Sequence, residues 1–408
     1  MPSSRRESGT RCGHELRTLR TYDLMHFVAR MVRGLEWVAA AEIEARIPDA
    51  TRITLSPREV EFQTVGVPGE LFELRSIDDI FLVTARVSEV GGTKAAIAPF
   101  ATSVASLDWE VQLTLVRRLR DLTAEIRFDV VASIEGQHSY NRFDIENAVG
   151  ALLSPRIKGQ HLARSASGAA SKTNPDLTIR IFLRNGEATV AVRLSSRPLH
   201  RRNYKLDTGA GTLHPPVAAA LTMIAGLSGS DVVVDPFCGD GTVAIEAVLM
   251  QPSLEFSASD LDPVRVENAR QNARRAGVDV PLSVADASLV PWSDLRVDAI
   301  VSNPPWNKAV KWSGAETSMD VVWRRARQSL LMQGHLCLIS EAQLELPTRL
   351  TQLGYFVSFS TLIRLSGRLS AVTLASPKDD ARIELSPALA AWQSQATALR
   401  LSIPTGEL

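Results

Sequence analysis

The stretch DVVVDPFCGDGT, residues 231–242, decides the fold expected of this chain. Its valines before Asp235 form a short apolar run, which is typical of a buried strand. A turn with two glycines follows, and from Thr242 to Met250 the apolar residues recur with helical spacing. A strand, a glycine turn and a helix are the arrangement with which doubly wound α/β proteins bind nucleotides. The sequence therefore predicts a Rossmann-like α/β domain.

The charges that follow the expected strands indicate the kind of cofactor. No Gly-Lys-Ser/Thr follows the turn, so it is not a P-loop. Asp235 and Asp240 repel a pyrophosphate and suit an ammonium or a sulfonium, as in S-adenosylmethionine. The second strand ends at Asp260, which we predict to bind a ribose diol, and the third at Asp286, which we predict to accept an adenine amino group. Asp262, directly before a proline, is interpreted as a helix N-cap.

The fourth expected strand ends in a second motif. Residues 297–308 read VDAIVSNPPWNK, an apolar run that enters Asn303-Pro304-Pro305-Trp306. The prolines end the strand and fix the backbone. The Asn303 side-chain oxygen and the Pro304 backbone oxygen can accept the two hydrogens of a weakly nucleophilic exocyclic amine, while Trp306 stacks on its ring. Taken alone, Asn-Pro-Pro is equally compatible with a proline-terminated core strand.

The order of these motifs resembles class I methyltransferases that act on amino groups, over residues 215–376. Here residues 355–365 and 369–376 flank Ser-Gly-Arg, and such a terminal hairpin inserts one antiparallel strand into the parallel sheet of that family. Two positions depart from the family: Asp240 stands where it often has Ser, and Trp306 where it usually has Tyr or Phe. A larger ring still stacks, but it narrows the pocket. The resemblance implies S-adenosyl-L-methionine as cofactor, no metal, cofactor binding by Asp235, Pro236, Cys238, Gly239, Gly241, Thr242, Asp260 and Asp286, and catalysis by Asn303, Pro304, Pro305 and Trp306.

The N-terminal half has the pattern of α+β domains. Residues 26–87 read as βαββαβ, the ferredoxin-like order, with its second helix near residues 70–74. Residues 94–195 alternate helices and strands and end in a hairpin at Asn185-Gly186. Together with Gly34-Leu35-Glu36, the helix at 141–150 and LHRRNYK at 199–205, this order resembles THUMP-containing RNA methyltransferases. In that family a ferredoxin-like and a THUMP domain together dock RNA.

A basic cluster with one aromatic ring lies near the junction of the two halves. Such a cluster can neutralise phosphates while a base or ribose stacks, although most charge runs are solvated linkers. The resemblance favours the first interpretation. The predicted RNA-binding residues are Arg197, His200, Arg201, Arg202, Tyr204 and Lys205.

Length and composition limit the possible organisation. A chain of 408 residues is expected to form two or three domains. The 45 basic and 45 acidic residues balance, so nucleic acid must be met by a local patch. No apolar run reaches transmembrane length, and three scattered cysteines favour a reducing cytoplasm. The expected division is 1–22 disordered tail, 23–93 ferredoxin-like, 94–195 THUMP-like, 196–213 linker, 214–377 methyltransferase and 378–408 tail.

The function implied by the resemblance is methylation of an exocyclic base amine in RNA. Guanine N2 in tRNA is the first candidate, and guanine N2 in rRNA is the second. An RNA-binding protein with an inert methyltransferase domain remains an alternative, against which the intact acids and glycines argue. A DNA or protein-glutamine methyltransferase would keep Asn303 and its neighbours, but it has no need of a THUMP-like half.

Overall fold

The computed structural model of the chain describes residues 24–164, 174–306, 319–377 and 383–403. The chain divides into two compact units: Leu82–Ser196, and Met25–Phe81 together with the residues from Arg197 onward. This division follows packing, whereas the expected domain boundaries follow sequence pattern, and those boundaries stay predictions. The tail expected at residues 1–22 lies outside the described residues, as do parts of the tail expected at 378–408.

The unit Leu82–Ser196 is built on strands in the order β4-β8-β7-β5-β6. Its β7 and β8 form an antiparallel hairpin that turns through Asn185 and Gly186 at φ values of 51° and 78°, which confirms the predicted hairpin. A capping box of Asn141 and Asp144 begins α4. The elements are η2 (Lys94–Ala96), α2 (Ile97–Ala105), α3 (Trp109–Leu119), β5 (Ile126–Ile134), α4 (Arg142–Ile157), β6 (Gly159–His161), β7 (Leu177–Arg184) and β8 (Glu187–Arg193).

Residues Met25–Phe81 have the βαββαβ order expected from the sequence, with a change in the second helix. Their strands lie in the order β2-β3-β1-β4. The second helix, expected near residues 70–74, is a single 3₁₀ turn of four residues. The elements are β1 (Leu24–Arg30), α1 (Glu36–Arg46), β2 (Thr51–Ser56), β3 (Glu59–Val65), η1 (Gly69–Phe72) and β4 (Asp79–Val87), the last of which continues into the other unit.

Residues from Arg197 onward form a seven-stranded sheet in the order β11-β10-β9-β12-β13-β15-β14. The first five strands are parallel, and β15 runs antiparallel to both of its neighbours. The predicted doubly wound fold with a terminal hairpin is therefore confirmed. Its strands are β9 (Val232–Asp235), β10 (Glu255–Asp260), β11 (Leu282–Val284), β12 (Val297–Ser302), β13 (Leu330–Glu341), β14 (Phe356–Leu365) and β15 (Arg368–Ser376).

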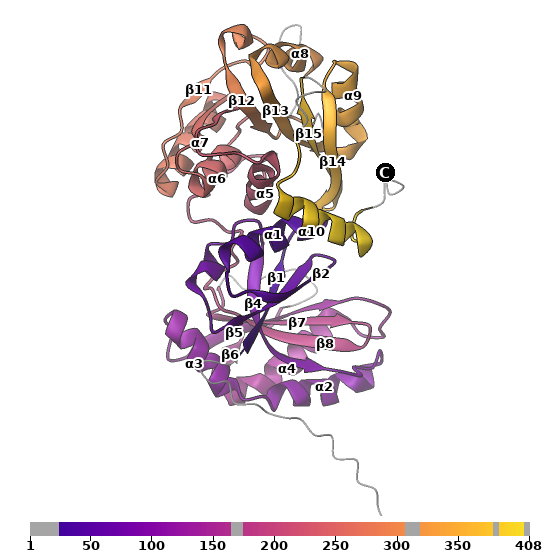
Figure 1. Cartoon of the computed structure of the whole chain (residues 1–408). Helices are drawn as coiled ribbons and strands as arrows, with labels where there is room; N and C mark the ends of the chain where they lie inside the picture. Colours follow the sequence, from indigo (N-terminus) through magenta and orange to yellow (C-terminus); the bar gives the residue numbers. More distant parts are fainter. Residues whose placement is uncertain (1–23, 165–173, 307–318, 378–382, 404–408) are drawn as a thin grey trace, which may run out of the picture. The chain divides into compact units, whose positions relative to one another are not determined.

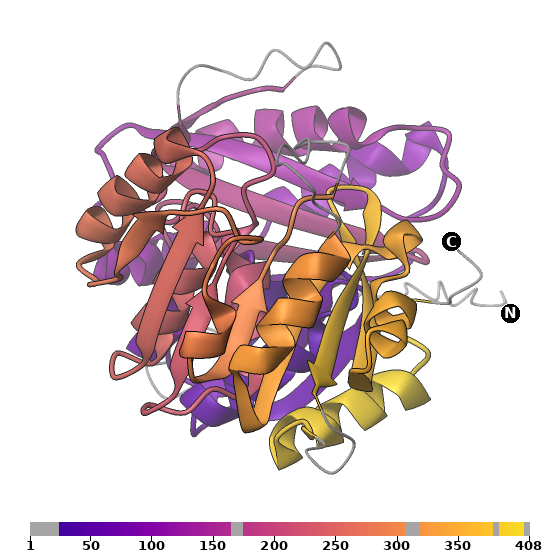
Figure 2. The same ribbon diagram turned by 90° about the horizontal axis from the view of Figure 1, so that it is seen from above.

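Helices cover both faces of this sheet (Figures 1 and 2). On one face Ile300 of β12 packs with Trp323 of α8 and Leu350 of α9. On the other face Cys337 of β13 contacts the Leu221 carbonyl of α5. The helices are α5 (Pro215–Ala225), α6 (Thr242–Met250), α7 (Pro263–Ala276), η3 (Trp292–Asp294), α8 (Met319–Ser329), η4 (Ala342–Leu344), α9 (Leu346–Gln352) and α10 (Pro387–Ala398).

A buried ion cluster joins Met25–Phe81 to the seven-stranded sheet. Glu246 of α6 is fully buried and accepts hydrogen bonds from Arg75 Nε at 2.7 Å, Arg202 Nε at 3.0 Å and the Tyr204 hydroxyl at 2.6 Å. Burial alone would raise the pKa of Glu246, but Arg202 and Arg75 hold it below its ordinary value. The carboxylate thus fixes α6, which begins at the glycine turn.

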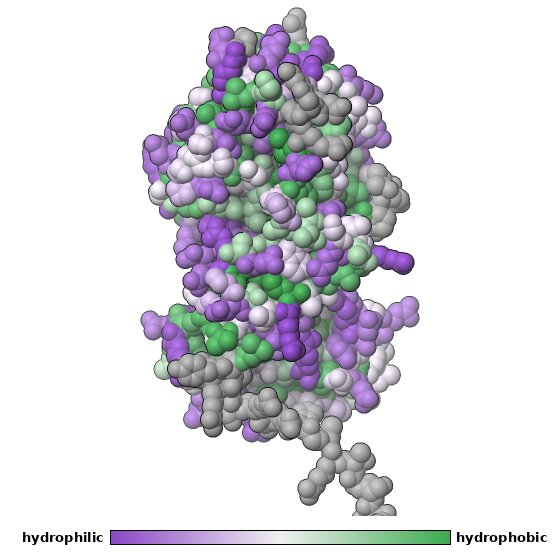
Figure 3. Space-filling view, viewed as in Figure 1, coloured by the Kyte–Doolittle hydropathy of each residue, from purple (hydrophilic) through white to green (hydrophobic). Residues whose placement is uncertain are grey.

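The C-terminal helix α10 returns to the N-terminal part of the same unit. It packs against α1 (Figure 1), and Trp392 Nε1 donates to Glu44 Oε2 at 2.9 Å. Leu389 and Ala396 of α10 are buried, as are Leu401 and Ile403 after it. Hydrophilic and hydrophobic residues are interspersed on the face drawn in Figure 3. No helix among the described residues is long and apolar enough to cross a membrane.

Candidate active site

A cavity of about 980 Å³ lies at the carboxyl ends of the parallel strands. Residues from the ends of β9, β10 and β12 and from the loop after β11 line it, so the motifs that were predicted separately share one space. Of the predicted cofactor-binding and catalytic residues, the lining includes Asp235, Pro236, Cys238, Gly239, Thr242, Asp260, Asp286, Asn303, Pro304, Pro305 and Trp306. Gly241 is the one exception: it is the N-cap of α6, between the lining residues Asp240 and Thr242.

The glycine turn approaches its neighbours too closely for side chains. Gly239 and Gly241 have φ values of 51° and 79°, in the left-handed region that favours glycine. A Cβ on Gly241 would stand 3.0 Å from the Ala269 side chain of α7. The Gly239 amide donates to Asp260 Oδ2 at 2.9 Å, which fixes the turn to the end of β10. This cradle suits a nucleoside that must lie directly on backbone.

Asp235 is buried between the cofactor turn and the Asn-Pro-Pro-Trp motif. Its Oδ1 accepts from Ser302 Oγ at 2.5 Å and from the Phe237 amide at 3.0 Å. Its Oδ2 is buried and has no hydrogen-bond partner among the described residues. Burial raises the pKa of Asp235 to about 7. An orphaned carboxylate oxygen that lines a cavity fits a cationic or hydrogen-bonding ligand, because such a ligand removes the cost of leaving it unpaired.

The other acids differ in how they are held. Asp262 accepts from the Val264 amide at 2.8 Å, which confirms it as the N-cap of α7. Asp260 Oδ1 accepts from the Asp262 amide at 3.0 Å, so both of its oxygens contact backbone. Asp286 Oδ1 accepts from the amide and hydroxyl of Ser288, at 2.8 and 2.7 Å. The side chains of Asp260 and Asp286 are thus held in fixed positions at the cavity wall, and their roles toward ribose and adenine stay predictions.

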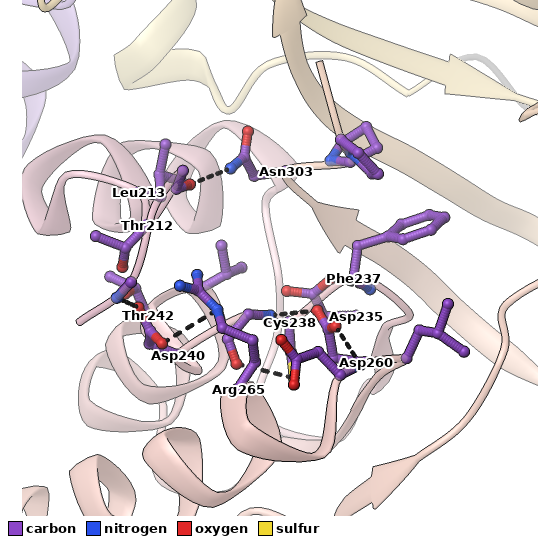
Figure 4. A pocket seen from close by; sticks show the side chains of 18 of the residues that line it. Thr212, Leu213, Asp235, Phe237, Cys238, Asp240, Thr242, Asp260, Arg265 and Asn303 are labelled. Carbon is purple, nitrogen blue, oxygen red and sulfur yellow. Dashed lines mark hydrogen bonds and ion pairs between the residues drawn. The ribbon is translucent and has the colours of Figure 1, made fainter. Parts of the chain in front are cut away.

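Asn303 is oriented by a carbonyl from a segment that sequence reasoning did not assign to the site. Its Nδ2 donates to the Gly211 carbonyl at 3.3 Å, and Figure 4 shows the side chain directed toward this segment. Asn303 Oδ1 is buried and has no hydrogen-bond partner among the residues that the structure describes. Trp306 Nε1 lies 3.4 Å from the Ile339 carbonyl, which anchors the ring beside the end of β13. The side-chain amide of Asn303 thus uses its nitrogen within the protein and keeps its oxygen available to a ligand.

Asp240 joins this segment, residues 207–213, to the glycine turn. Its Oδ2 accepts from the Gly209 amide at 2.9 Å, and its Oδ1 accepts from Asn268 Nδ2 at 3.2 Å. Arg265 Nε lies 3.2 Å from the same Oδ1. Asp240, which stands where the resembled family often has Ser, thus binds groups of the protein itself.

The predicted RNA-binding residues fall into two groups. Arg197 and Arg201 are exposed. The other four are buried or partly buried: Arg202 and Tyr204 bind Glu246, Lys205 Nζ donates to the Leu213 carbonyl, and His200 Nδ1 lies 3.1 Å from the Asp78 carbonyl. Tyr204 is buried, so its ring offers no face to a base in this structure. Part of the basic cluster that the sequence suggests for RNA binding therefore makes contacts inside the protein.

Sequence reasoning missed three parts of the cavity wall: residues 209–213, Arg265, and the hairpin turn with Ser366 and Arg368. The strand register explains why the hairpin turn lines the cavity, because Ser370 of β15 pairs with Glu341 at the end of β13. The start of β15 therefore stands at the same sheet edge as Asn303. The sequence did contain a signal for Arg265, since a cation in the first turn of a helix opposes the helix dipole.

The site holds no evident metal ligands or reactive thiol. Among the described residues, no group of three His, Cys, Asp or Glu side chains is placed to hold a metal ion. Cys238 is buried, and burial raises the pKa of its thiol, so it contributes backbone and shape, not a nucleophile.

The strand order with its single antiparallel strand, the acid-lined glycine turn and the Asn-Pro-Pro-Trp corner define a class I, S-adenosylmethionine-dependent methyltransferase. Residues 202–355 match the model of the family UPF0020, described as the RMKL-like methyltransferase domain. The predicted enzyme class and cofactor are confirmed.

Similar proteins extend this result. A tRNA (guanine(6)-N2)-methyltransferase of Thermus thermophilus is 28% identical over 67% of this chain and 76% of its own length. A ribosomal RNA large subunit methyltransferase K/L of Vibrio campbellii is 28% identical over 34% of this chain, and the match spans only 26% of that relative. The crystal structure of TrmN from Thermus thermophilus matches with a TM-score of 0.68 at 24% identity and covers 86% of this chain and 99% of that one. A putative methyltransferase complexed with SAH matches with a TM-score of 0.63 at 16% identity and covers 88% and 99%.

Proposed function

We propose that this protein methylates RNA on an exocyclic base amine, with guanine N2 of tRNA as the acceptor. The observation that carries the proposal is the single cavity that joins the acid-lined glycine turn to Asn303-Pro304-Pro305-Trp306. A methyl donor and a flat amine acceptor can meet there. The match to a tRNA (guanine(6)-N2)-methyltransferase over two thirds of the chain supports the choice of acceptor.

The residues of the site suit this chemistry without a covalent intermediate on the protein. S-adenosylmethionine, when bound, supplies an electrophilic methyl group. The unpaired Asn303 Oδ1 and the Pro304 carbonyl can accept the two amine hydrogens, which favours a pyramidal nitrogen with an available lone pair. Trp306 offers a ring against which the base can stack, once the nucleotide has left its helix.

Two groups of residues are proposed to hold the cofactor and the RNA. Asp235, Asp260 and Asp286, with the glycine turn, would hold the cofactor, since the cradle and the orphaned Asp235 Oδ2 fit it. The exposed Arg197 and Arg201 remain proposed phosphate contacts. Leu82–Ser196 is proposed as the THUMP-like RNA-docking part, and the buried reduced cysteines Cys238 and Cys337 agree with the cytoplasm as the place of action.

Incubation of the full chain with labelled S-adenosylmethionine and bulk tRNA, with rRNA in parallel, tests the proposal. The products are digested to nucleosides and separated. We expect label in N2-methylguanosine from tRNA. Label only from rRNA would favour the second candidate, which the similarity to the K/L methyltransferase supports.

Two other results would contradict the proposal. Label on DNA or on a protein glutamine would move the acceptor to another class of molecule. Binding of S-adenosylhomocysteine without transfer to either RNA would favour a binding protein with an inert methyltransferase domain.

A further inference from the structure

Arg265 is a cation in a cavity whose charged lining is mainly acidic. Five aspartates and two arginines line the cavity. Arg368 begins β15, whereas Arg265 lies beside the glycine turn (Figure 4). A guanidinium here repels the sulfonium and ammonium groups that the aspartates attract. The buried Asp240 accounts for one edge of this guanidinium, so only its remaining donor groups lack a partner among the described residues.

The position of Arg265 in α7 does not help the helix. Asp262 is the N-cap and Pro263 the first helical residue, which places Arg265 third in the first turn. A positive charge there opposes the helix dipole. The first turn of α7 itself has no acidic residue, and the nearest acid on the helix is its N-cap, Asp262.

The guanidinium lies between two glycines. A Cβ on Gly239 would stand 2.9 Å from Nη2, and a Cβ on Gly209 would overlap Nη1. Both glycines line the cavity. Glycine at these positions therefore leaves room for Arg265 between the cofactor turn and the 207–213 segment.

Only one edge of the guanidinium is used. Its Nε lies 3.2 Å from Asp240 Oδ1, and Asp240 is fully buried while the Arg265 side chain is 16% exposed. Neither Nη group donates a hydrogen bond to any part of the chain that the structure describes. A largely buried guanidinium with two unused donor groups facing a cavity is arranged for a planar anion, which it can bind through two parallel hydrogen bonds.

We infer that Arg265 binds the carboxylate at the amino-acid end of the cofactor, through Nη1 and Nη2, while Asp240 holds its Nε. The inference rests on the proposed function, because S-adenosylmethionine carries a single anionic group, its carboxylate. A phosphate of the acceptor RNA is the other anion that could enter the cavity. Arg265 lies with Asp240, on the side of the cofactor turn, and Asn303 marks the acceptor side (Figure 4).

Calorimetry with two ligands tests this assignment without any turnover. S-adenosylhomocysteine contains the amino-acid end, and 5′-methylthioadenosine lacks it. We expect Arg265→Met to weaken S-adenosylhomocysteine about 10- to 100-fold, the size of a charge-assisted hydrogen-bonded pair, and to change 5′-methylthioadenosine less than about threefold. Arg265→Lys should restore part of the difference, because it returns the charge but not the fork.

Arg274→Met is the matched control, since Arg274 is an exposed arginine of the same helix. It should leave both affinities unchanged. Equal weakening of both ligands by Arg265→Met, or no weakening of either, would overturn the inference and leave the proposed function standing. Failure of the unmodified protein to bind either ligand would overturn both.

Discussion

Asn303 shows how one contact can assign the chemistry of a side chain. The Gly211 carbonyl takes the amide nitrogen, so the oxygen is the group left without a partner. A buried acceptor without a donor is unfavourable by about 1–3 kcal/mol, and an exocyclic amine can supply that donor. The residue is thus prepared for a ligand that donates, as guanine N2 does.

We expect Asn303→Ala to lower turnover on the accepted RNA by about 100-fold or more, because an acceptor that acts on the reacting amine is lost. Binding of S-adenosylhomocysteine should stay within about threefold. Single-turnover rates and calorimetry measure the two effects. Asn203→Ala, an exposed change outside the cavity, is the control. Turnover that survives Asn303→Ala would refute the role of the amide.

Asp235 predicts a pH dependence of stability in the ligand-free protein. Its pKa is about 7 in the folded chain and 3.8 ordinarily, so the folded state favours the protonated form. Its contribution to stability is complete below about pH 4 and is lost as pH rises toward 7. Relative to Asp235→Asn, the wild type should lose on the order of 1.4 kcal/mol per pH unit in this window. Urea unfolding of both proteins at pH 5, 6 and 7 measures the difference, and a constant difference would disprove the shift.

At the scale of elements, α6 connects the cofactor turn to the rest of its unit. The helix starts at the glycine turn, and its Glu246 binds Arg75 before β4 and Arg202 from the segment before α5. Three chain segments that are distant in sequence therefore meet on one carboxylate. The position of the turn depends on this buried cluster as well as on its own glycines.

Removing the carboxylate leaves two largely buried guanidinium groups without their counter-ion. We expect Glu246→Ala to lower the free energy of unfolding by about 3–5 kcal/mol, and Tyr204→Phe by about 1 kcal/mol, because only one hydrogen bond is lost. Glu267→Ala on the surface of α7, whose partner Arg270 is also exposed, should change stability by less than about 0.5 kcal/mol. Chemical unfolding distinguishes these values. Equal effects of Glu246→Ala and Glu267→Ala would contradict the anchoring role.

At the scale of the molecule, the first and last described segments of one unit pack together. The helix α10 lies on α1, although the methyltransferase sheet separates them in sequence. Leu389 and Ala396 of α10 are buried, as are Leu401 and Ile403 after it. The C-terminal segment, which showed no chemistry in the sequence, therefore has a structural role.

A chain that ends at Ile383 should fold but unfold at a lower temperature. It loses the burial of Leu389, Ala396, Leu401 and Ile403, worth on the order of 1–3 kcal/mol for each large side chain. Hydrogen exchange should accelerate in α1 and stay unchanged in β9 and β12. Trp392→Phe, which removes only the hydrogen bond to Glu44, should produce a much smaller shift. Unaltered exchange in α1 after truncation would refute the packing role.

The sequence by itself determined the fold class and the main residues of the site. Apolar runs, glycines and prolines act locally, and parallel strands bring their carboxyl ends to one edge. For that reason Asp235, Asp260, Asp286 and Asn303 could be predicted to meet, and they line one cavity.

Only the tertiary structure decided which charged residues face that cavity and which face the interior. Arg202 and Arg265 are both paired with a buried carboxylate, Glu246 and Asp240 respectively, yet only Arg265 lines the cavity. Glu246, which pairs with Arg202, and Gly209, which lies against Arg265, are each tens of residues away from that arginine in the sequence. A charge pattern gives no information on such distant partners, because burial and pairing arise only when the segments pack.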